Sequence, residues 1–301
     1  MSGPFDGPVD RSTVVDRIES HPIEGGPEEQ RQAFAELVIG DDSERLDGGA
    51  VDFAGEGGTI VYLHGGGYVF GSPRTHERIG ATLAELTGLA VTMPAYPLAP
   101  EHPWPAQLDA AMAAVGQAQG PVVLAGDSAG GHLALVTALE SRRRGVELAG
   151  LVLFSPNTDR TGLSTTRQRN EPSDPMVDDE GDRALAHQCF GNLPDDDPQV
   201  SPLLDDLRLL PPLHVEVGDG EVLFDDSRLL AEAARAAGVE VTLHVEPGGL
   251  HMMQLWTPWW EAAADSLERA AAFATEVTGR STTGRDEPQA PTSGPRESRP
   301  T

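Results

Sequence analysis

Short apolar runs alternate with longer segments of helical periodicity from residue 59 onward, and this alternation restricts the fold more than any other feature. The runs predict strands at residues 59–64, 89–96, 122–126, 150–155, 213–217 and 239–245. Apolar residues spaced three and four apart predict helices at residues 77–88, 105–118, 128–144 and 226–238. Alternating strands and helices form βαβ units. We therefore predict an α/β fold with a mostly parallel sheet covered by helices on both faces.

Three segments fall outside this alternation. Residues 1–45 hold two amphipathic helical patterns ahead of the sheet, and residues 160–197 form a polar insertion around one short helical stretch. Residues 280–301 are rich in Pro, Ser, Thr, Gly and Arg and hold almost nothing apolar, which predicts a disordered tail. The main domain is therefore expected to span residues 46–279, with the insertion lying on top of the sheet.

The charge of the chain limits its partners. It has 48 acidic and 21 basic residues, all of the latter Arg, and a formal net charge of -27. Such a surface repels nucleic acids and anionic membranes, so neither is expected as a partner. The acidic excess fits either adaptation to high salt or the Arg-rich composition that a GC-rich genome encodes.

A cytoplasmic location is expected from the cysteine content and from the apolar runs. Cys189 is the single cysteine of the sequence, so an internal disulfide is excluded. No apolar run is long enough to span a bilayer, and the first residues lack the apolar stretch of a secretory signal. The sequence leaves a monomer and a homodimer equally open.

The stretch Gly126-Asp127-Ser128-Ala129-Gly130 matches the G-x-S-x-G pattern of a nucleophile elbow. The pattern alone also fits a plain glycine-rich turn. Here, however, a predicted strand precedes it and a predicted helix follows it, which is the context that the elbow requires. We therefore predict Ser128 as a catalytic nucleophile, which needs a general base and a site for an oxyanion.

Glycines after the first long strand supply a candidate oxyanion site. His64-Gly65-Gly66-Gly67 directly follows that strand, and glycines let backbone N–H groups turn toward a ligand. We predict that the N–H groups of Gly66, Gly67 and Ala129 form the oxyanion hole. His64 precedes the nucleophile in the chain, so we interpret it as a residue that fixes the loop and not as the base.

Several motifs, in order, resemble the hormone-sensitive-lipase-like family of α/β-hydrolase esterases. They are HGGGYVFGS (64–72), YPLAPEHPWPAQLDA (96–110) and GDSAGG (126–131), extended by residues 199–227 and 247–256. The resemblance covers about residues 60–275. It implies the α/β-hydrolase fold, a small helical cap built from residues 1–45 and 160–197, and a serine esterase that needs neither metal nor organic cofactor. The segment before Thr59 is short, so the first strands of the family are expected to be reduced.

The general base is predicted from the order Ser, acid, His that this fold uses. Five histidines follow the nucleophile: His132, His187, His214, His244 and His251. Only His251 lies in a loop at the carboxyl end of the last predicted strand, where it can reach Ser128. The resemblance points to the same residue.

The acid is expected within residues 214–227, which hold five carboxylates after the next-to-last predicted strand begins. Glu216 alternates within that strand and should face away from the site. Asp225 and Asp226 suit the start of the following helix as caps or dipole partners. Glu221 matches the acid position of the family, and Asp219 remains the alternative.

The resemblance implies an esterase acting on a small ester. Residues that could line its pocket are apolar and close to the motifs, although each also suits an ordinary core: Tyr68, Val69, Phe70, Met176, Val177, Leu250 and Met252. The expected activity is hydrolysis of short- to medium-chain acyl esters. A lipase, a deacetylase or an amidase would use the same residues, and a binding protein on a hydrolase fold is the alternative from another class.

Overall fold

A single seven-stranded sheet forms the centre of the molecule. The structure is a computed structural model that describes residues 3–40 and 49–281. The strands are β1 (Val51–Phe53), β2 (Thr59–Leu63), β3 (Ala90–Met93), β4 (Val122–Asp127), β5 (Gly150–Phe154), β6 (Leu213–Gly218) and β7 (Val241–Glu246). They lie in the order β1-β3-β2-β4-β5-β6-β7, and every pair is parallel except β1 with β3. The predicted α/β fold with a mostly parallel sheet is confirmed.

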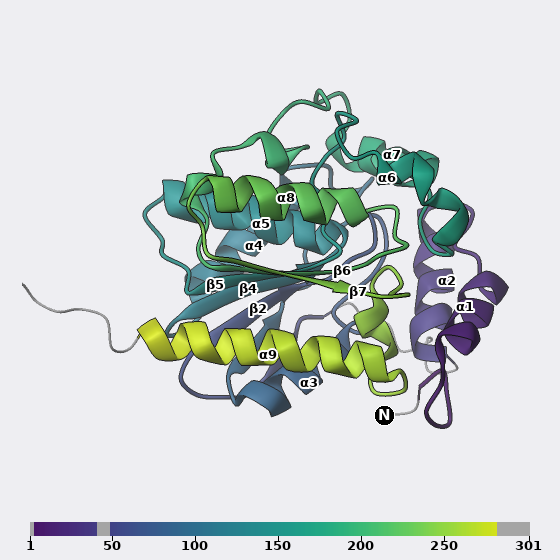
Figure 1. Cartoon of the computed structure of the whole chain (residues 1–301), viewed down its shortest axis with the longest axis horizontal. Helices are drawn as coiled ribbons and strands as arrows, with labels where there is room; N and C mark the ends of the chain where they lie inside the picture. Colours follow the sequence, from purple (N-terminus) through teal and green to yellow (C-terminus); the bar gives the residue numbers. More distant parts are fainter. Residues whose placement is uncertain (1–2, 41–48, 282–301) are drawn as a thin grey trace, which may run out of the picture.

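Helices cover both faces of this sheet, as predicted (Figure 1). α3 (Glu77–Thr87) and α9 (Glu261–Ser281) lie below it in the view of Figure 1. α4 (Ala106–Gln117), α5 (Ala129–Arg143) and α8 (Phe224–Ala236) lie above it. Every residue of β2, β4, β5 and β6 is buried, as expected for strands that helices cover on both faces.

The strand order brings the two glycine-rich motifs together. The chain crosses from β3 to β4 on the other side of β2, so the loops that follow β2 and β4 diverge to opposite faces at this point. Leu63 and Gly126 are register partners near the carboxyl ends of these strands. In open α/β sheets, ligands bind in the crevice that such a reversal creates.

The N-terminal segment and the insertion gather at the same end of the sheet (Figure 1). The N-terminal helices are α1 (Arg11–Ser20) and α2 (Pro27–Ile39), and the insertion holds α6 (Thr166–Arg169) and α7 (Asp179–Phe190). Short 3-10 turns complete the chain at Glu171–Ser173, Pro202–Leu204, Leu207–Leu209 and Met253–Trp256. Of the helices in the described ranges, none has both the length and the apolar character to cross a membrane.

Two elements of the structure, β1 and α9, are absent from the predicted strands and helices. β1 has only three residues and pairs antiparallel at the sheet edge, which fits the expected reduction of the first strands. α9 was not among the predicted helices, and it continues to Ser281, two residues into the predicted tail. The remainder of that tail lies outside the described residues.

Candidate active site

Ser128 stands on a strained turn between β4 and α5. Its backbone has φ 53°, a conformation that non-glycine residues rarely adopt. The turn is tight because neighbouring backbones touch: a Cβ at Gly130 would lie 2.0 Å from the carbonyl oxygen of Leu63. Glycine is therefore required there, and the turn projects the hydroxyl beyond the carboxyl edge of the sheet.

Ser128, His251 and Glu221 form a continuous chain of hydrogen bonds. Nε2 of His251 lies 2.9 Å from Oγ of Ser128, and Nδ1 lies 3.0 Å from Oε2 of Glu221. The other carboxylate oxygen of Glu221 accepts bonds from the hydroxyl of Ser155 and from the N–H of Gly218. His251 and Glu221 are fully buried, so their geometry is fixed before any ligand enters.

The surroundings of His251 favour its protonated form. Burial by itself lowers the pKa of the imidazole, but the hydrogen bond and the negative charge of Glu221 outweigh it, and the pKa lies above the usual 6.5. Asp174, from the insertion, adds a second negative charge to this site. Its own pKa is raised by burial and by the charge of Glu221.

The five carboxylates of residues 214–227 have different positions. Asp219 lies in the turn after β6, and its Oδ1 accepts the N–H of Gly248 at 2.9 Å. Glu216 is buried on the side of α9, where it binds His214 and Arg269. Of the two candidates for the acid, only Glu221 bonds to His251.

Asp225 and Asp226 lie in the first turn of α8, where the predicted dipole partners would lie, but neither caps the helix, so that part of the prediction is wrong. Asp225 accepts Nε of Arg228 within α8, and both carboxylates also bond to the insertion. Oδ2 of Asp225 accepts the N–H and hydroxyl of Thr165. Oδ1 of Asp226 accepts Nη2 of Arg167 at 2.9 Å and the N–H of Thr158 at 2.8 Å. They tie the insertion to the start of α8.

The glycine loop after β2 faces the nucleophile. In the described part of the chain, the N–H groups of Gly66, Gly67 and Ala129 have no hydrogen-bond acceptor. Ala129 is the first residue of α5, so its N–H also lies at the positive end of a helix dipole. The ring of His64 is buried and stacked on Tyr96, in keeping with a role in fixing this loop.

A cavity of about 200 Å³ opens onto Ser128 and His251. Four of the predicted pocket residues line it: Phe70, Met176, Val177 and Met252. The prediction for Tyr68, Val69 and Leu250 is wrong for this cavity, because their side chains are buried in the core. Further lining residues, which sequence reasoning missed, come from the N-terminal segment and from α7 and its approach: Ile23, Gln30, Asp178, Gly181, Asp182, Ala184, Leu185 and Gln188.

Comparisons with known proteins agree with this geometry. A family described as alpha/beta hydrolase fold matches residues 60–255. The chain belongs to the α/β-hydrolase family. It is 35% identical to an esterase of Acinetobacter venetianus over 226 residues, which are 72% of this chain and 75% of the relative. It is also 35% identical to an acetyl-hydrolase of Streptomyces hygroscopicus over 231 residues, which are 74% of this chain and 77% of that protein.

Solved structures place the hydrolase within one branch of that family. The crystal structure of an esterase from the bacterial hormone-sensitive lipase family superposes with a TM-score of 0.80 at 30% identity. The alignment covers 89% of this chain and 98% of that one. The resemblance to the hormone-sensitive-lipase-like esterases is therefore confirmed.

Three residues that bond to Glu221 or to its neighbour Val222 in this α/β hydrolase were not identified from the sequence. Ser155, at the end of β5, donates its hydroxyl to Glu221 at 2.9 Å. In the insertion, Asn170 donates to the carbonyl of Glu221, and Asp174 accepts the N–H of Val222. Ser155 was detectable in principle, because it ends a strand at the same sheet edge; the other two depend on how the insertion folds.

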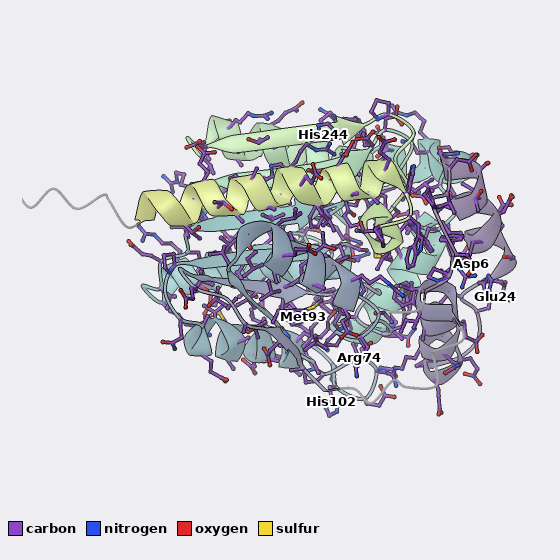
Figure 2. The ribbon with its side chains drawn as sticks, turned by 90° about the horizontal axis from the view of Figure 1, so that it is seen from below. Asp6, Glu24, Arg74, Met93, His102 and His244 are labelled. Carbon is purple, nitrogen blue, oxygen red and sulfur yellow. The ribbon has the colours of Figure 1, made fainter. Side chains whose placement is uncertain are left out.

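The histidines that the sequence offered as alternatives lie elsewhere in the hydrolase. His244 is on the edge strand β7 and bonds to Glu246. Figure 2 shows it well removed from Asp6, which precedes α1, and from Glu24, which lies between α1 and α2. His214 bonds to Glu216, and His132 is buried in α5. Of the histidines after Ser128, only His251 bonds to its hydroxyl in the described structure.

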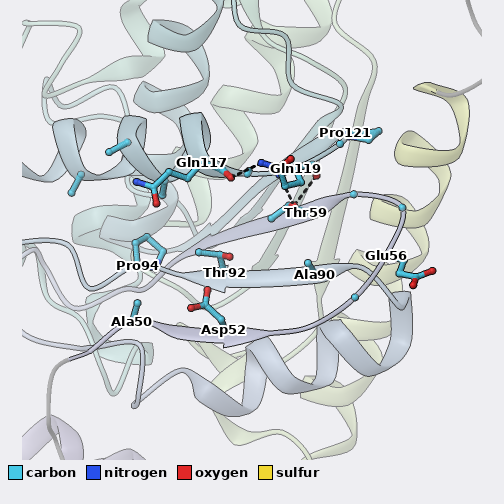
Figure 3. Close-up of a pocket in the computed structure, with 18 residues that line it drawn as sticks. Ala50, Asp52, Glu56, Thr59, Ala90, Thr92, Pro94, Gln117, Gln119 and Pro121 are labelled. Carbon is cyan, nitrogen blue, oxygen red and sulfur yellow. Dashed lines mark hydrogen bonds between the residues drawn. The ribbon is translucent and has the colours of Figure 1, made fainter.

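A second, larger hollow of about 1040 Å³ lies between α4 and the edge of the sheet formed by β1, β3 and the start of β2 (Figure 3). Asp52, Thr59, Thr92 and Gln117 are among its lining residues, and none of the lining residues is a His or a Cys. It lacks a nucleophile paired with a base. Within residues 3–40 and 49–281, no cluster of three His, Cys, Asp or Glu side chains could hold a metal ion.

Proposed function

We propose that this chain is a serine carboxylesterase that uses Ser128 as nucleophile, His251 as general base and Glu221 as the acid of the triad. The observation that carries the proposal is the pair of hydrogen bonds to His251, at 2.9 Å to Ser128 and 3.0 Å to Glu221. The names of the relatives, esterase and acetyl-hydrolase, support the same activity.

The reaction proceeds by acyl transfer to the serine. Nε2 of His251 takes the hydroxyl proton as Oγ of Ser128 attacks the ester carbonyl carbon. The carbonyl oxygen becomes anionic and accepts the N–H groups of Gly66, Gly67 and Ala129. The intermediate collapses, the C–O bond breaks, and the leaving alcohol takes the proton from His251. Water then attacks the acyl-enzyme by the same route, which releases the acid and restores Ser128.

Glu221 holds His251 in the tautomer whose Nε2 faces Ser128 and stabilises the imidazolium that forms. In the described structure, the carboxylate oxygen of Glu221 that does not bond to His251 accepts hydrogen bonds from two neutral donors, the hydroxyl of Ser155 and the N–H of Gly218. The charge therefore remains available to the imidazolium.

We infer that residues 1–45 and 160–197 act as a cap that sets the size of the acyl group. Ile23 and Gln30 from the first segment and Leu185 from α7 line the same cavity as Ser128. That cavity, at about 200 Å³, is smaller than the 300–1,000 Å³ typical of sites for drug-sized ligands. Short- to medium-chain acyl esters fit this size.

Turnover of p-nitrophenyl esters of increasing acyl length tests the proposal. We expect a maximum among the short chains and a loss of about a millionfold in kcat for Ser128→Ala. A fluorophosphonate should label the wild type at Ser128 and leave Ser128→Ala unlabelled. Hydrolysis that survives Ser128→Ala in a folded protein would refute the assignment.

A further inference from the structure

The residue that follows the oxyanion glycines is held in a conformation that it does not favour. Gly66, Gly67 and Tyr68 all have positive φ, at 115°, 59° and 67°. Glycine adopts such angles freely, but in a bulky residue they cost about 1–3 kcal/mol and persist only where the surroundings impose them. The side chain of Tyr68 is buried, so its contacts must supply that restraint.

The restraint comes from the helix that carries the nucleophile. The hydroxyl of Tyr68 lies 2.5 Å from Nδ1 of His132. His132 lies one turn after Ser128 in α5, and its N–H donates to the carbonyl of Ser128 at 3.0 Å. A second tie comes from the backbone, where the carbonyl of Tyr68 accepts the N–H of Ala99. The short side-chain bond therefore links the end of the glycine loop to the helix whose first N–H is that of Ala129.

Both members of this pair are neutral at ordinary pH. Burial, reinforced by the charge of Arg160, lowers the pKa of His132 to about 3. Burial also raises the pKa of Tyr68 well above its usual value, so the phenol keeps its proton and donates it to Nδ1. Nε2 then carries the imidazole hydrogen; the backbone carbonyls of Gln199 and Val200 lie near the ring, and the rings of Trp104 and Phe190 pack beside it.

Trp104 and Phe190 pack against the ring of His132, and an apolar side chain could make the same contacts. What the histidine adds is a single acceptor for Tyr68. Neither residue lines the cavity that opens onto Ser128.

We propose that Tyr68 and His132 are positioning residues for the oxyanion hole, a role that rests on the proposed function. Their hydrogen bond holds the N–H groups of Gly66 and Gly67 close enough to the N–H of Ala129 for all three to donate to one oxyanion. Oxyanion donors act only when they lie about 3 Å from the developing charge. The pair therefore contributes to the transition state and not to binding of the ground-state ester.

Tyr68→Phe tests this, because it removes one hydroxyl and keeps the ring. We expect kcat to fall by about tenfold to fiftyfold, less than the 10²–10³ that loss of a whole oxyanion donor costs, with KM within about twofold. Affinity for an alkyl boronic acid, which becomes tetrahedral on Ser128, should fall by a similar factor. Affinity for an unreactive ether analogue of the substrate should not change.

Thr59→Val is the matched control. It also removes a buried hydroxyl, which donates to the carbonyl of Gln119 at 2.8 Å at the opposite end of β2 (Figure 3). It should lower the melting temperature without changing kcat or boronate affinity. If Tyr68→Phe behaves in the same way, the pair has only a structural role and the proposal is wrong.

A double-mutant cycle with His132→Leu provides the second test. If the two residues act through their mutual bond, the double variant should be no slower than the slower single variant. If the losses in kcat of the two single variants multiply in the double variant, the proposal is wrong. Failure of the proposed function is separate, because it would appear as wild-type hydrolysis that does not depend on Ser128.

Discussion

Two buried glutamate–histidine pairs have their glutamates on β6 and in the loop that follows it, and they differ in their surroundings. Glu216 lies 2.8 Å from Nε2 of His214, and Glu221 lies 3.0 Å from Nδ1 of His251. The distances are almost equal, and both glutamates are fully buried. Contact between a carboxylate and an imidazole therefore does not distinguish a catalytic pair from a structural one.

The difference lies in what else each pair contacts. Glu216 also accepts two bonds from the guanidinium of Arg269, so a permanent cation neutralises it. Among the described residues, Glu221 receives only neutral donors besides His251, and the far nitrogen of His251 faces a hydroxyl on a strained turn. A carboxylate without a competing cation, joined through histidine to a nucleophile, is the arrangement that can stabilise a transient positive charge.

The largest expected effect is that of Glu221→Gln on turnover. The change keeps the shape of the side chain but removes the charge that orients His251 and stabilises its protonated form. We expect kcat to fall about ten-thousandfold, with the fold intact by circular dichroism. A nearly normal rate would show that Glu221 is not the acid.

Glu216→Gln should have the opposite profile. It leaves Arg269 partly buried without its main partner, which typically costs 3–5 kcal/mol; we expect about 3 kcal/mol, because Arg269 is still 30% exposed and has Glu246 at 3.4 Å. Denaturant unfolding measures this loss. Turnover per folded molecule should stay near the wild-type rate, and a large loss would mean that the two pairs are not independent.

The dependence on pH should separate the pairs further. The base must be neutral, and the pKa of His251 is raised, so activity should fall as pH drops through a value above 6.5. Glu221→Gln should move this acid limb of kcat/KM to lower pH. If the acid limb of kcat/KM does not move in Glu221→Gln, the charge of Glu221 is not what raises the pKa of His251.

The free energy of unfolding should depend on the ionisation of Glu216, at a pH below the one at which His251 controls activity. Burial raises the pKa of Glu216, but the bonds from His214 and Arg269 outweigh it and the net shift is downward. A carboxylate with a lowered folded-state pKa stabilises the protein above its unfolded-state pKa, and this contribution is lost as pH falls through the folded-state value. Glu216→Gln should therefore flatten the acid side of the stability profile, as unfolding at pH 3–7 would measure.

Asp219→Asn should have the smallest effect of the series. Asp219 lies two residues from Glu221, but its role is one bond to the N–H of Gly248 at an exposed turn. The amide oxygen of Asn can still accept this N–H, so the bond weakens by at most about 1 kcal/mol, which limits any effect on rate to about fivefold. A larger drop in kcat would make Asp219 a part of the acid site.

These contacts also explain which parts of the structure the sequence predicts. The central strands and the Ser128 turn are predictable, because full burial demands continuous apolar runs and close backbone contact demands glycine. β1 was not predictable, because its three residues are too few to show a strand periodicity. Local reasoning predicts Asp226 as a cap or dipole partner of the helix; it does lie in the first turn, but its carboxylate bonds to a buried partner in the insertion, Arg167, and caps nothing. Tyr68 follows a glycine loop and was expected in the pocket, yet its positive φ turns it into the core.

The ties between α8 and the insertion have a consequence for engineering. Asp225 and Asp226 hold the insertion from the same short segment that carries Glu221. The insertion is therefore not an interchangeable module. A chimera that replaces residues 160–197 alone would leave Asp226 in the interior without its guanidinium and would disturb the helix start next to the acid. Chimeras with other members of the family should keep both sides of this contact from a single parent.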